Sequence, residues 1–128
     1  MCRVAWLGLA MAVLVTAGCG DRHAAMTTDA TSPSGRYRLS VFEDGPEVGF
    51  RVTDRDGTPV LEPDTRWSRR HRYAIIWGEG DIVWAHSSDV GTTVWQPQPD
   101  GRWDRALWID THLTPPAELT EEFPREFR

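Results

Sequence analysis

The chain contains only two cysteines, Cys2 and Cys19, and no lysine. Two thiols cannot build the multi-bridge framework that stabilises small secreted domains, so the fold must depend on burial of apolar side chains. All 14 basic residues are arginine, and 19 acidic residues give a formal net charge of −5. This acidic balance lacks the basic footprint that nucleic-acid binding needs, so we expect no nucleic acid as a partner.

Motifs for catalysis and for metal or cofactor binding are also lacking. The sequence has no Gly-x-Ser-x-Gly nucleophile elbow and no phosphate-binding glycine loop. His71, His86 and His112 do not have metal-ligand spacing, so we expect no metal and no cofactor. His86, Ser87, Ser88 and Asp89 are the most tempting catalytic set. They lie too close together along a predicted strand, where consecutive side chains point to opposite faces.

Long hydrophobic runs are limited to one, the twelve residues from Val4 to Val15. A membrane-spanning helix needs about 20 apolar residues, so this run is too short to cross a bilayer. It follows the positive Arg3 and has the length of the hydrophobic region of a signal peptide. The segment Thr16-Ala-Gly-Cys19 comes directly after it. This end of the chain resembles a bacterial lipoprotein signal, although that family usually has leucine at the position of Thr16.

The resemblance implies cleavage before Cys19 and acylation of its thiol, with palmitate among the lipids attached. Two acyl chains anchor a protein stably, and lipidation would explain a single cysteine in the mature chain. We therefore expect a lipid-anchored protein on the extracytoplasmic face of the cell membrane. Residues 1–18 are predicted to be the signal peptide, 19–35 a flexible tether, and 36–128 a single β-rich domain. An ordinary cleaved secretory signal is the alternative.

Alternating polarity and β-branched or aromatic residues predict strands throughout the domain. The predicted strands are 36–41, 48–52, 58–61, 73–77, 81–87, 92–96 and 102–110. Short glycine-bearing connections at 78–80 and 88–91 predict an antiparallel meander at the centre. The expected fold class is all-β, a small antiparallel meander or sandwich of about six to eight strands with a short C-terminal helix. We expect the core to bury at least two of Trp77, Trp84 and Trp95.

Residues 114–123 carry a helix-start signal, with Thr114 as the N-cap and prolines in the first turn. Leu119 and Phe123 are four positions apart and can dock together on the sheet. Elsewhere, the segment Pro99-Asp-Gly-Arg-Trp103 echoes Pro33-Ser-Gly-Arg-Tyr37. Both are similar to the turn that opens strands in β-propeller blades. A lone blade cannot fold, so we interpret the echo as shared turn chemistry.

Residues 62–72 form the one long irregular segment, and loops of this kind often carry binding function. Guanidinium groups suit phosphate and carboxylate partners, and a neighbouring indole would add stacking area. The alternative is a solvated connection whose arginines pair with the many carboxylates of the chain. The candidate ligand-binding residues are Arg66, Trp67, Arg69, Arg70, His71 and Arg72.

Two functions of different classes remain open from the sequence. The first is a non-catalytic binding or interaction domain at the cell envelope, with an anionic envelope component or an acidic protein as its partner. The alternative is a small envelope hydrolase that uses the region of His86, Ser88 and Asp89, or scattered carboxylates such as Glu79, Asp81 and Asp89. Paired carboxylates hydrolyse glycosides when about 5 to 9 Å apart.

Overall fold

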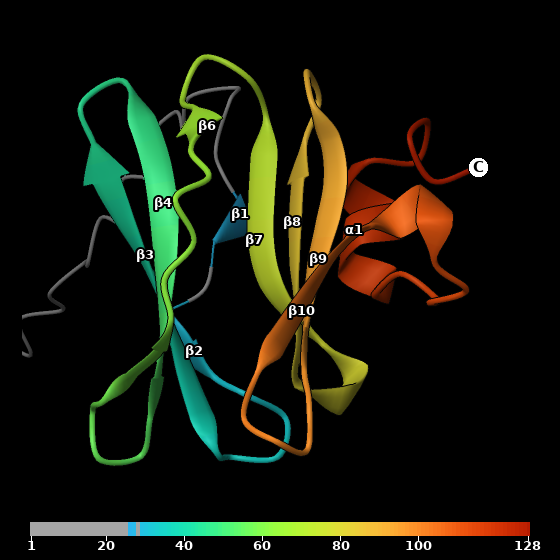
Figure 1. The fold of residues 1–128 in the computed structure, drawn as a ribbon. Helices are drawn as coiled ribbons and strands as arrows, with labels where there is room; N and C mark the ends of the chain where they lie inside the picture. Colours follow the sequence, from blue (N-terminus) through green and yellow to red (C-terminus); the bar gives the residue numbers. More distant parts are fainter. Residues whose placement is uncertain (1–25, 28) are drawn as a thin grey trace, which may run out of the picture.

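The computed structural model describes residues 26–27 and 29–128. The predicted signal peptide, the lipobox and Cys19 lie outside these residues. The described chain forms two β-sheets that face each other, with a short helix on the outer side of one of them (Figure 1). Within the described residues, no helix is both long and apolar enough to span a membrane.

One sheet, here called the β7–β10 sheet, has five strands. In spatial order these are β1 (Met26–Thr27), β7 (Tyr73–Gly78), β8 (Ile82–Ser87), β9 (Gly91–Pro97) and β10 (Trp103–Leu107). The pairs β7–β8, β8–β9 and β9–β10 are antiparallel, whereas β1 runs parallel to β7. The predicted central meander is therefore confirmed, with Ile75 opposite Ala85 and Ala85 opposite Thr93.

The facing sheet, here called the β3–β4 sheet, is entirely antiparallel. It contains β2 (Ala30–Thr31), β3 (Tyr37–Asp44), β4 (Glu47–Asp54) and β5 (Pro59–Leu61), and β6 (Trp67–Ser68) also pairs with β4. The all-β fold class and the sandwich are confirmed. Strands β1, β2 and β6 were not predicted, because each is only two residues long and has no alternating pattern.

The predicted boundary between tether and domain at residue 36 is wrong. Ala30 and Thr31 pair with Leu39 and Arg38 of β3, and Ser32 is buried. The Ser32 hydroxyl also accepts a hydrogen bond of 3.1 Å from the backbone N–H of Tyr37. Residues 26–27 and 30–31 are thus part of the sheets, held mainly by backbone pairing that composition does not reveal.

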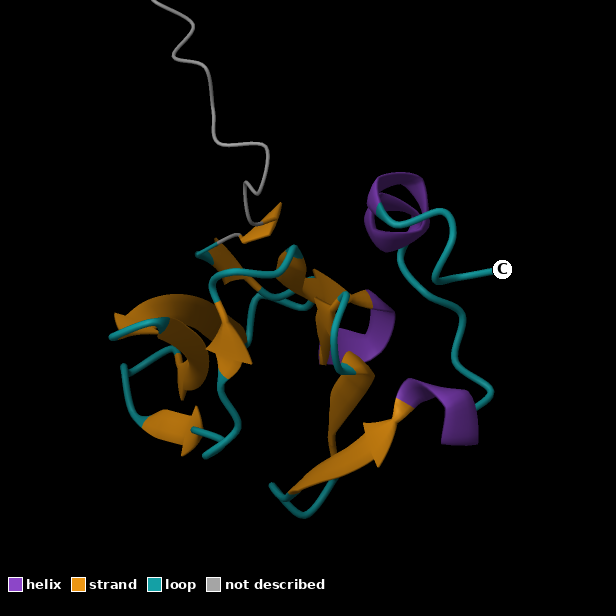
Figure 2. Cartoon of the chain, turned by 90° about the horizontal axis from the view of Figure 1, so that it is seen from above, coloured by secondary structure: helices purple, strands orange, loops and turns teal. Residues whose placement is uncertain are grey.

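Strands β7 and β8 at the centre of the β7–β10 sheet are buried on both faces, which explains their nearly continuous apolar sequences. Along β8, Val83 and Ala85 face the other sheet, and Ile82 and Trp84 face outward under the C-terminal segment. Figure 2 shows this third layer on the far side of the sheet. The expected burial of at least two central tryptophans is confirmed for Trp84 and Trp95, while Trp77 is half-buried.

The C-terminal helix α1 spans Ala117–Glu122, and its N-cap is Pro116. The prediction of Thr114 as N-cap is wrong, because two consecutive prolines keep the chain extended before the helix begins. Leu119 and Phe123 are both buried against the sheet, as predicted. The predicted strand 102–110 is also too long, since β10 gives way to the 3-10 helix η2 (Trp108–Asp110).

Candidate functional site

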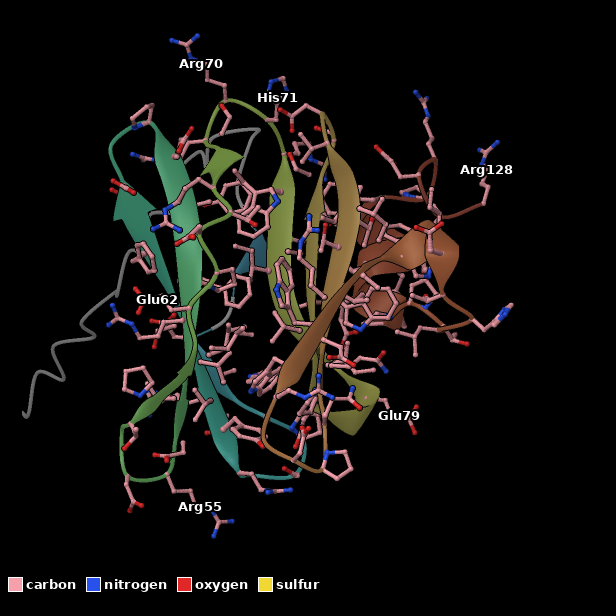
Figure 3. All side chains as sticks on the ribbon, viewed as in Figure 1. Arg55, Glu62, Arg70, His71, Glu79 and Arg128 are labelled. Atoms are coloured by element: carbon pink, nitrogen blue, oxygen red, sulfur yellow. The ribbon has the colours of Figure 1, made fainter. Side chains whose placement is uncertain are left out.

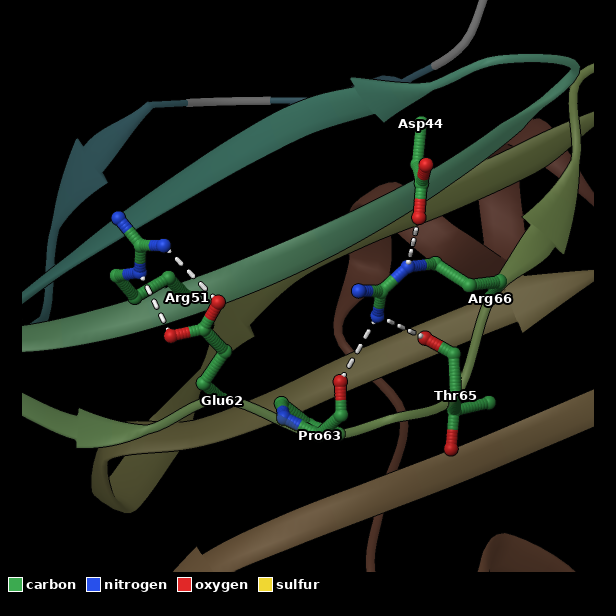
Figure 4. Close-up of polar contacts among 6 residues, drawn as sticks. All are labelled: Asp44, Arg51, Glu62, Pro63, Thr65 and Arg66. Atoms are coloured by element: carbon green, nitrogen blue, oxygen red, sulfur yellow. Dashed lines mark hydrogen bonds and ion pairs between the residues drawn. The ribbon is translucent and has the colours of Figure 1, made fainter.

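The arginines of the predicted binding loop are spread over different partners. Arg66 donates from Nε to Asp44 at 3.0 Å and from one terminal nitrogen to the backbone oxygens of Pro63 and Thr65 at 2.9 and 3.1 Å (Figure 4). Its guanidinium carbon lies 5.0 Å from the centre of the Phe42 ring. Arg66 therefore ties the loop to β3 and is not presented to a ligand.

Trp67 is 3% exposed, so the expectation that its indole adds stacking area beside the arginines is wrong. It stacks on Phe50 at a centroid distance of 5.9 Å and meets Trp95 edge-on at 6.0 Å. The surrounding sequence is polar, yet pairing of β6 with β4 turns this one side chain inward. Trp67 belongs to the core between the sheets.

Ion pairs also hold two more arginines of the loop. Arg69 lies 3.1 Å from Glu43, and Arg72 pairs with Glu122 of α1. His71 lies 3.6 Å from Asp89. Arg70 is exposed at the tip and enters none of the ion pairs among the described residues (Figure 3). The guanidinium groups do not converge on one point. This arrangement agrees with the alternative interpretation, in which the arginines of a solvated connection pair with carboxylates.

The loop's first residue is paired in the same way. Arg51 donates to both carboxylate oxygens of Glu62, at 2.9 and 3.0 Å (Figure 4). This pairing lowers the pKa of the Glu62 carboxyl. Exposed ion pairs of this kind typically contribute about 0 to 1 kcal/mol, so their role is chiefly to define the path of the loop.

His86 and Ser88, the proposed hydrolase residues, point to different parts of the molecule. The His86 ring is buried under the C-terminal segment, 4.4 Å from the centre of the Phe123 ring. The Ser88 hydroxyl donates to the backbone oxygen of Arg72 at 3.3 Å. Asp89 accepts a hydrogen bond from Ser87 instead. These residues therefore do not form a nucleophile–base pair, because His86 lies in β8 under the C-terminal segment and Ser88 lies in the turn after the strand.

His86 is nonetheless unusual. Its Nδ1 lies 2.8 Å from the Thr92 hydroxyl, and its Nε2 is buried without a hydrogen-bond partner. Burial lowers the pKa of the imidazole. Two smaller effects oppose each other, since Glu126 raises this pKa and Arg72 lowers it. An uncharged ring accepts this apolar site at low cost, whereas an imidazolium would leave one charged N–H unsatisfied. The histidine is thus part of the packing between sheet and C-terminal segment.

Two of the carboxylates suggested for glycosidic chemistry, Asp81 and Asp89, are far apart, whereas Glu79 lies in the same 3-10 helix as Asp81. Asp81 precedes β8 and Asp89 follows it, with the six residues of the strand between them. At about 3.3 Å per residue this separates the two by about 20 Å or more, well beyond a catalytic pair. Among residues 26–27 and 29–128, no three His, Cys, Asp or Glu side chains come close enough to hold a metal ion.

A groove missed by the sequence analysis lies at the end of the sandwich opposite the Arg70 loop tip. We call it the end groove, and its volume is about 440 Å³, within the range of about 300 to 1,000 Å³ usual for small-molecule sites. Three segments remote in sequence meet there: the turn before β3, the 3-10 helix η1 (Glu79–Asp81), and the turn after β9. The lining residues are Ser34, Arg36, Tyr37, Gly80, Asp81, Pro97, Gln98 and Pro99.

The two turns of the end groove are the two segments of the sequence echo, 33–37 and 99–103. Gly35 and Gly101 have φ values of 79° and 86°, a left-handed conformation that suits glycine. Each glycine N–H donates to the carbonyl three residues earlier, at 2.9 and 3.0 Å. The turns lie side by side at the lower end of Figure 1. The echo was thus the one sequence signal that could have located this site.

An aromatic cluster packs against Tyr37, one of the residues that line the groove. Tyr37 meets Trp103 edge-on at a centroid distance of 5.1 Å and stacks on Trp77 at 6.4 Å. The Trp77 indole N–H donates to the Ala30 oxygen at 2.8 Å. Because the ring of Tyr37 is packed on two sides, it forms a fixed wall of the groove. On its other side lies a second hollow of about 300 Å³ lined by Arg36, Asp54, Arg55 and Asp56.

The backbone of the groove is strained at one point. Asp81 has a φ of 58°, and it alone among the described non-glycine residues has a positive φ. Its buried carboxylate accepts hydrogen bonds from Ser34, from the backbone N–H at 3.0 Å and from the hydroxyl. This side chain clamps the first turn onto η1. Strained residues held by their surroundings often occur at functional sites.

Comparison with other proteins adds no further assignment, since no protein-family model, curated protein or solved structure matches this chain.

Proposed function

We propose that this chain is an exported lipoprotein, anchored at the extracytoplasmic face of the cell membrane through acylated Cys19, with a non-catalytic binding domain. The anchor is supported by the apolar run, the segment Thr16-Ala-Gly-Cys19, and the lack of a second cysteine in the mature chain. The observation that carries the binding function is the end groove. It is open, has fixed walls, and gathers polar groups and a tyrosine ring from three distant segments.

The other candidate surfaces give less support. In the loop 62–72, three of the four arginines of the predicted site are engaged with carboxylates and the tryptophan is in the core. The hydrolase alternative is weakened because His86 and Ser88 have separate partners, Thr92 and the backbone oxygen of Arg72. Arg70 and His71 remain exposed at the loop tip, so a secondary contact with an acidic partner is still a prediction for them.

The position of the groove suits an anchored protein. The first described residue, Met26, pairs with Ala74 near the start of β7, whereas the groove lies beyond the strand's last residue, Gly78. Met26 is seven positions after Cys19, a reach of at most about 25 Å when fully extended. An anchor at Cys19 would therefore enter near one end of the sandwich and leave the groove at the other, open to envelope components.

Mass spectrometry of the mature N-terminal peptide tests the anchor. We expect a peptide that begins at an acylated Cys19, and an unmodified cysteine or a different cleavage site would contradict the anchor. The binding function is tested by photo-cross-linking in cells, with a photoreactive residue at Pro99 in the groove or at Val90, which is 66% exposed on the hairpin between β8 and β9. We expect reproducible adducts from position 99 that position 90 does not give. The same adducts from both positions, or none, would contradict the groove as the binding surface.

A further inference from the structure

The walls of the end groove combine flat apolar surfaces with short polar groups. The Tyr37 ring, Pro97 and Pro99 supply rigid surfaces that lose little conformational freedom when covered. Between them, Ser34 and Gln98 supply a hydroxyl and an amide that can donate and accept hydrogen bonds. A sugar ring has the same character, with apolar C–H faces and a hydroxyl-bearing edge. A few convergent polar groups in an apolar pocket are what fixes the orientation of a small ligand.

Three carboxylates near the groove are already engaged. Asp81 accepts both hydrogen bonds from Ser34, and Asp100 pairs with Arg102 at 2.6 Å. Asp54 accepts the backbone N–H groups of Asp56 and Thr58, at 2.9 and 3.0 Å, within its own turn. Their negative charges are thus committed to fixing the turns.

Arg36 is a basic residue of the groove lining that is available to a ligand. Its side chain is exposed, and none of the ion pairs among the described residues includes it. The guanidinium carbon lies 5.5 Å from the centre of the Tyr37 ring. An exposed guanidinium fork can pair with a carboxylate of a ligand in bidentate fashion. Within the groove lining, Arg36 is therefore the exposed charged side chain, whereas the Asp81 carboxylate is buried.

We propose that the end groove binds a carboxylate-bearing sugar unit, whose ring packs against Pro97, Pro99 and the accessible part of Tyr37 and whose carboxylate pairs with Arg36. This inference rests on the proposed binding function and specifies its ligand class. Glycans that carry such acidic units fit an envelope location. One free guanidinium and one aromatic wall match one carboxylate on one ring, whereas a phosphate group usually requires several backbone N–H donors or cations.

Isothermal titration of the purified full-length chain in detergent tests the proposal, with trigalacturonate as the acidic probe and galactotriose as the neutral one. We expect trigalacturonate to bind with an affinity that falls as salt rises. Arg36→Ala should weaken this binding at least about tenfold, because a charge-assisted bidentate contact is lost. The matched control is Arg70→Ala, an exposed arginine outside the described ion pairs at the opposite end, and it should change the affinity less than about twofold (Figure 3).

Two further variants separate stacking from charge. Tyr37→Leu keeps an apolar side chain but removes the ring, and we expect it to weaken both probes. If this variant melts at a lower temperature than the parent, Gln98→Ala replaces it, because Gln98 lies outside the aromatic cluster. Arg36→Ala should leave the weaker binding of galactotriose unchanged.

Three results would overturn the inference: equal affinity of Arg36→Ala and the parent for trigalacturonate, equal affinity of the parent for both probes, or no binding of trigalacturonate. The proposed function is judged separately. Adducts at Pro99 in cells without trigalacturonate binding would reject the acidic sugar but keep the groove. Loss of both would reject the groove as a binding site.

Discussion

The Asp81 carboxylate holds Ser34, a residue 47 positions earlier in the chain, by hydrogen bonds from its backbone N–H and its hydroxyl. This contact joins the turn before β3 to η1 of the opposite sheet. It also keeps Asp81 in a left-handed conformation with a φ of 58°. The shape of the end groove therefore depends on a link between the two sheets and not on either sheet alone.

Breaking this link should destabilise the protein in a coupled way. Asp81→Ala loses both hydrogen bonds. Alanine also has a β-carbon, so the left-handed conformation at position 81 remains disfavoured by about 1 to 2 kcal/mol. Asp81→Gly loses the bonds but relieves the backbone, so it should be less harmful than alanine. Ser34→Ala combined with Asp81→Gly should cost less than the sum of the single changes. Urea denaturation measures each value, and strict additivity would show that the two side chains do not interact.

His86 should make stability depend on pH. Burial lowers the pKa of His86 in the folded state below the ordinary value of 6.5, so the unfolded chain takes up a proton first as pH falls. Stability should therefore decrease as pH drops below about 6.5, with a slope of at most about 1.4 kcal/mol per pH unit from this one group. Above that pH its contribution is fully present.

The His86→Leu variant is the control for this effect, since leucine fills a similar space beside Phe123 and Phe127 without titrating. Urea midpoints at pH 7.5, 6.5 and 5.5 should fall more steeply in the parent than in the variant. Parallel slopes in the two proteins would mean that His86 is protonated as easily in the folded state as in the unfolded one.

The central tryptophans should differ in their importance for stability. Trp84 is 1% exposed and packs under the C-terminal segment, so Trp84→Ala should cost about 3 to 5 kcal/mol. Trp77 is only half-buried, and Trp77→Ala should cost less. Because a β-carbon on Gly78 would lie 2.3 Å from the Trp84 Nε1, Gly78→Ala should be destabilising too. Thermal or urea unfolding that moves little for Trp84→Ala would contradict this description of the core.

Much of the fold could be predicted from the sequence, because alternation and β-branched residues mark strands wherever a face is buried. This holds for β3, β4 and the meander from β7 to β9. Strands β1 and β2 could not be predicted, since they consist of small or polar residues held by backbone pairing. The burial of Trp67 was missed for a related reason. Its local sequence is polar, and only contact with Phe50 and Trp95 places it inside.

The candidate site was harder to predict than the fold. Charge density drew attention to the loop 62–72, but a sequence does not show that Glu43, Asp44 and Glu122 lie beside its arginines. The end groove is built from three separate segments, the first of which lies more than 40 positions before the other two, so no local pattern describes it. Only the two echoed turns hinted at it, and their meeting through Tyr37 and Trp103 is a tertiary contact.

The most direct measurement of the central claim, a ligand site in the end groove, is an NMR map of backbone amide shifts during titration of the isotope-labelled full-length chain with trigalacturonate. We predict that the shifts concentrate at the three segments of the groove, at residues 34–37, 80–81 and 98–103, and that Arg36→Ala abolishes them at the same ligand concentration. Shifts concentrated at residues 66–72, or spread evenly over the domain, would contradict the claim.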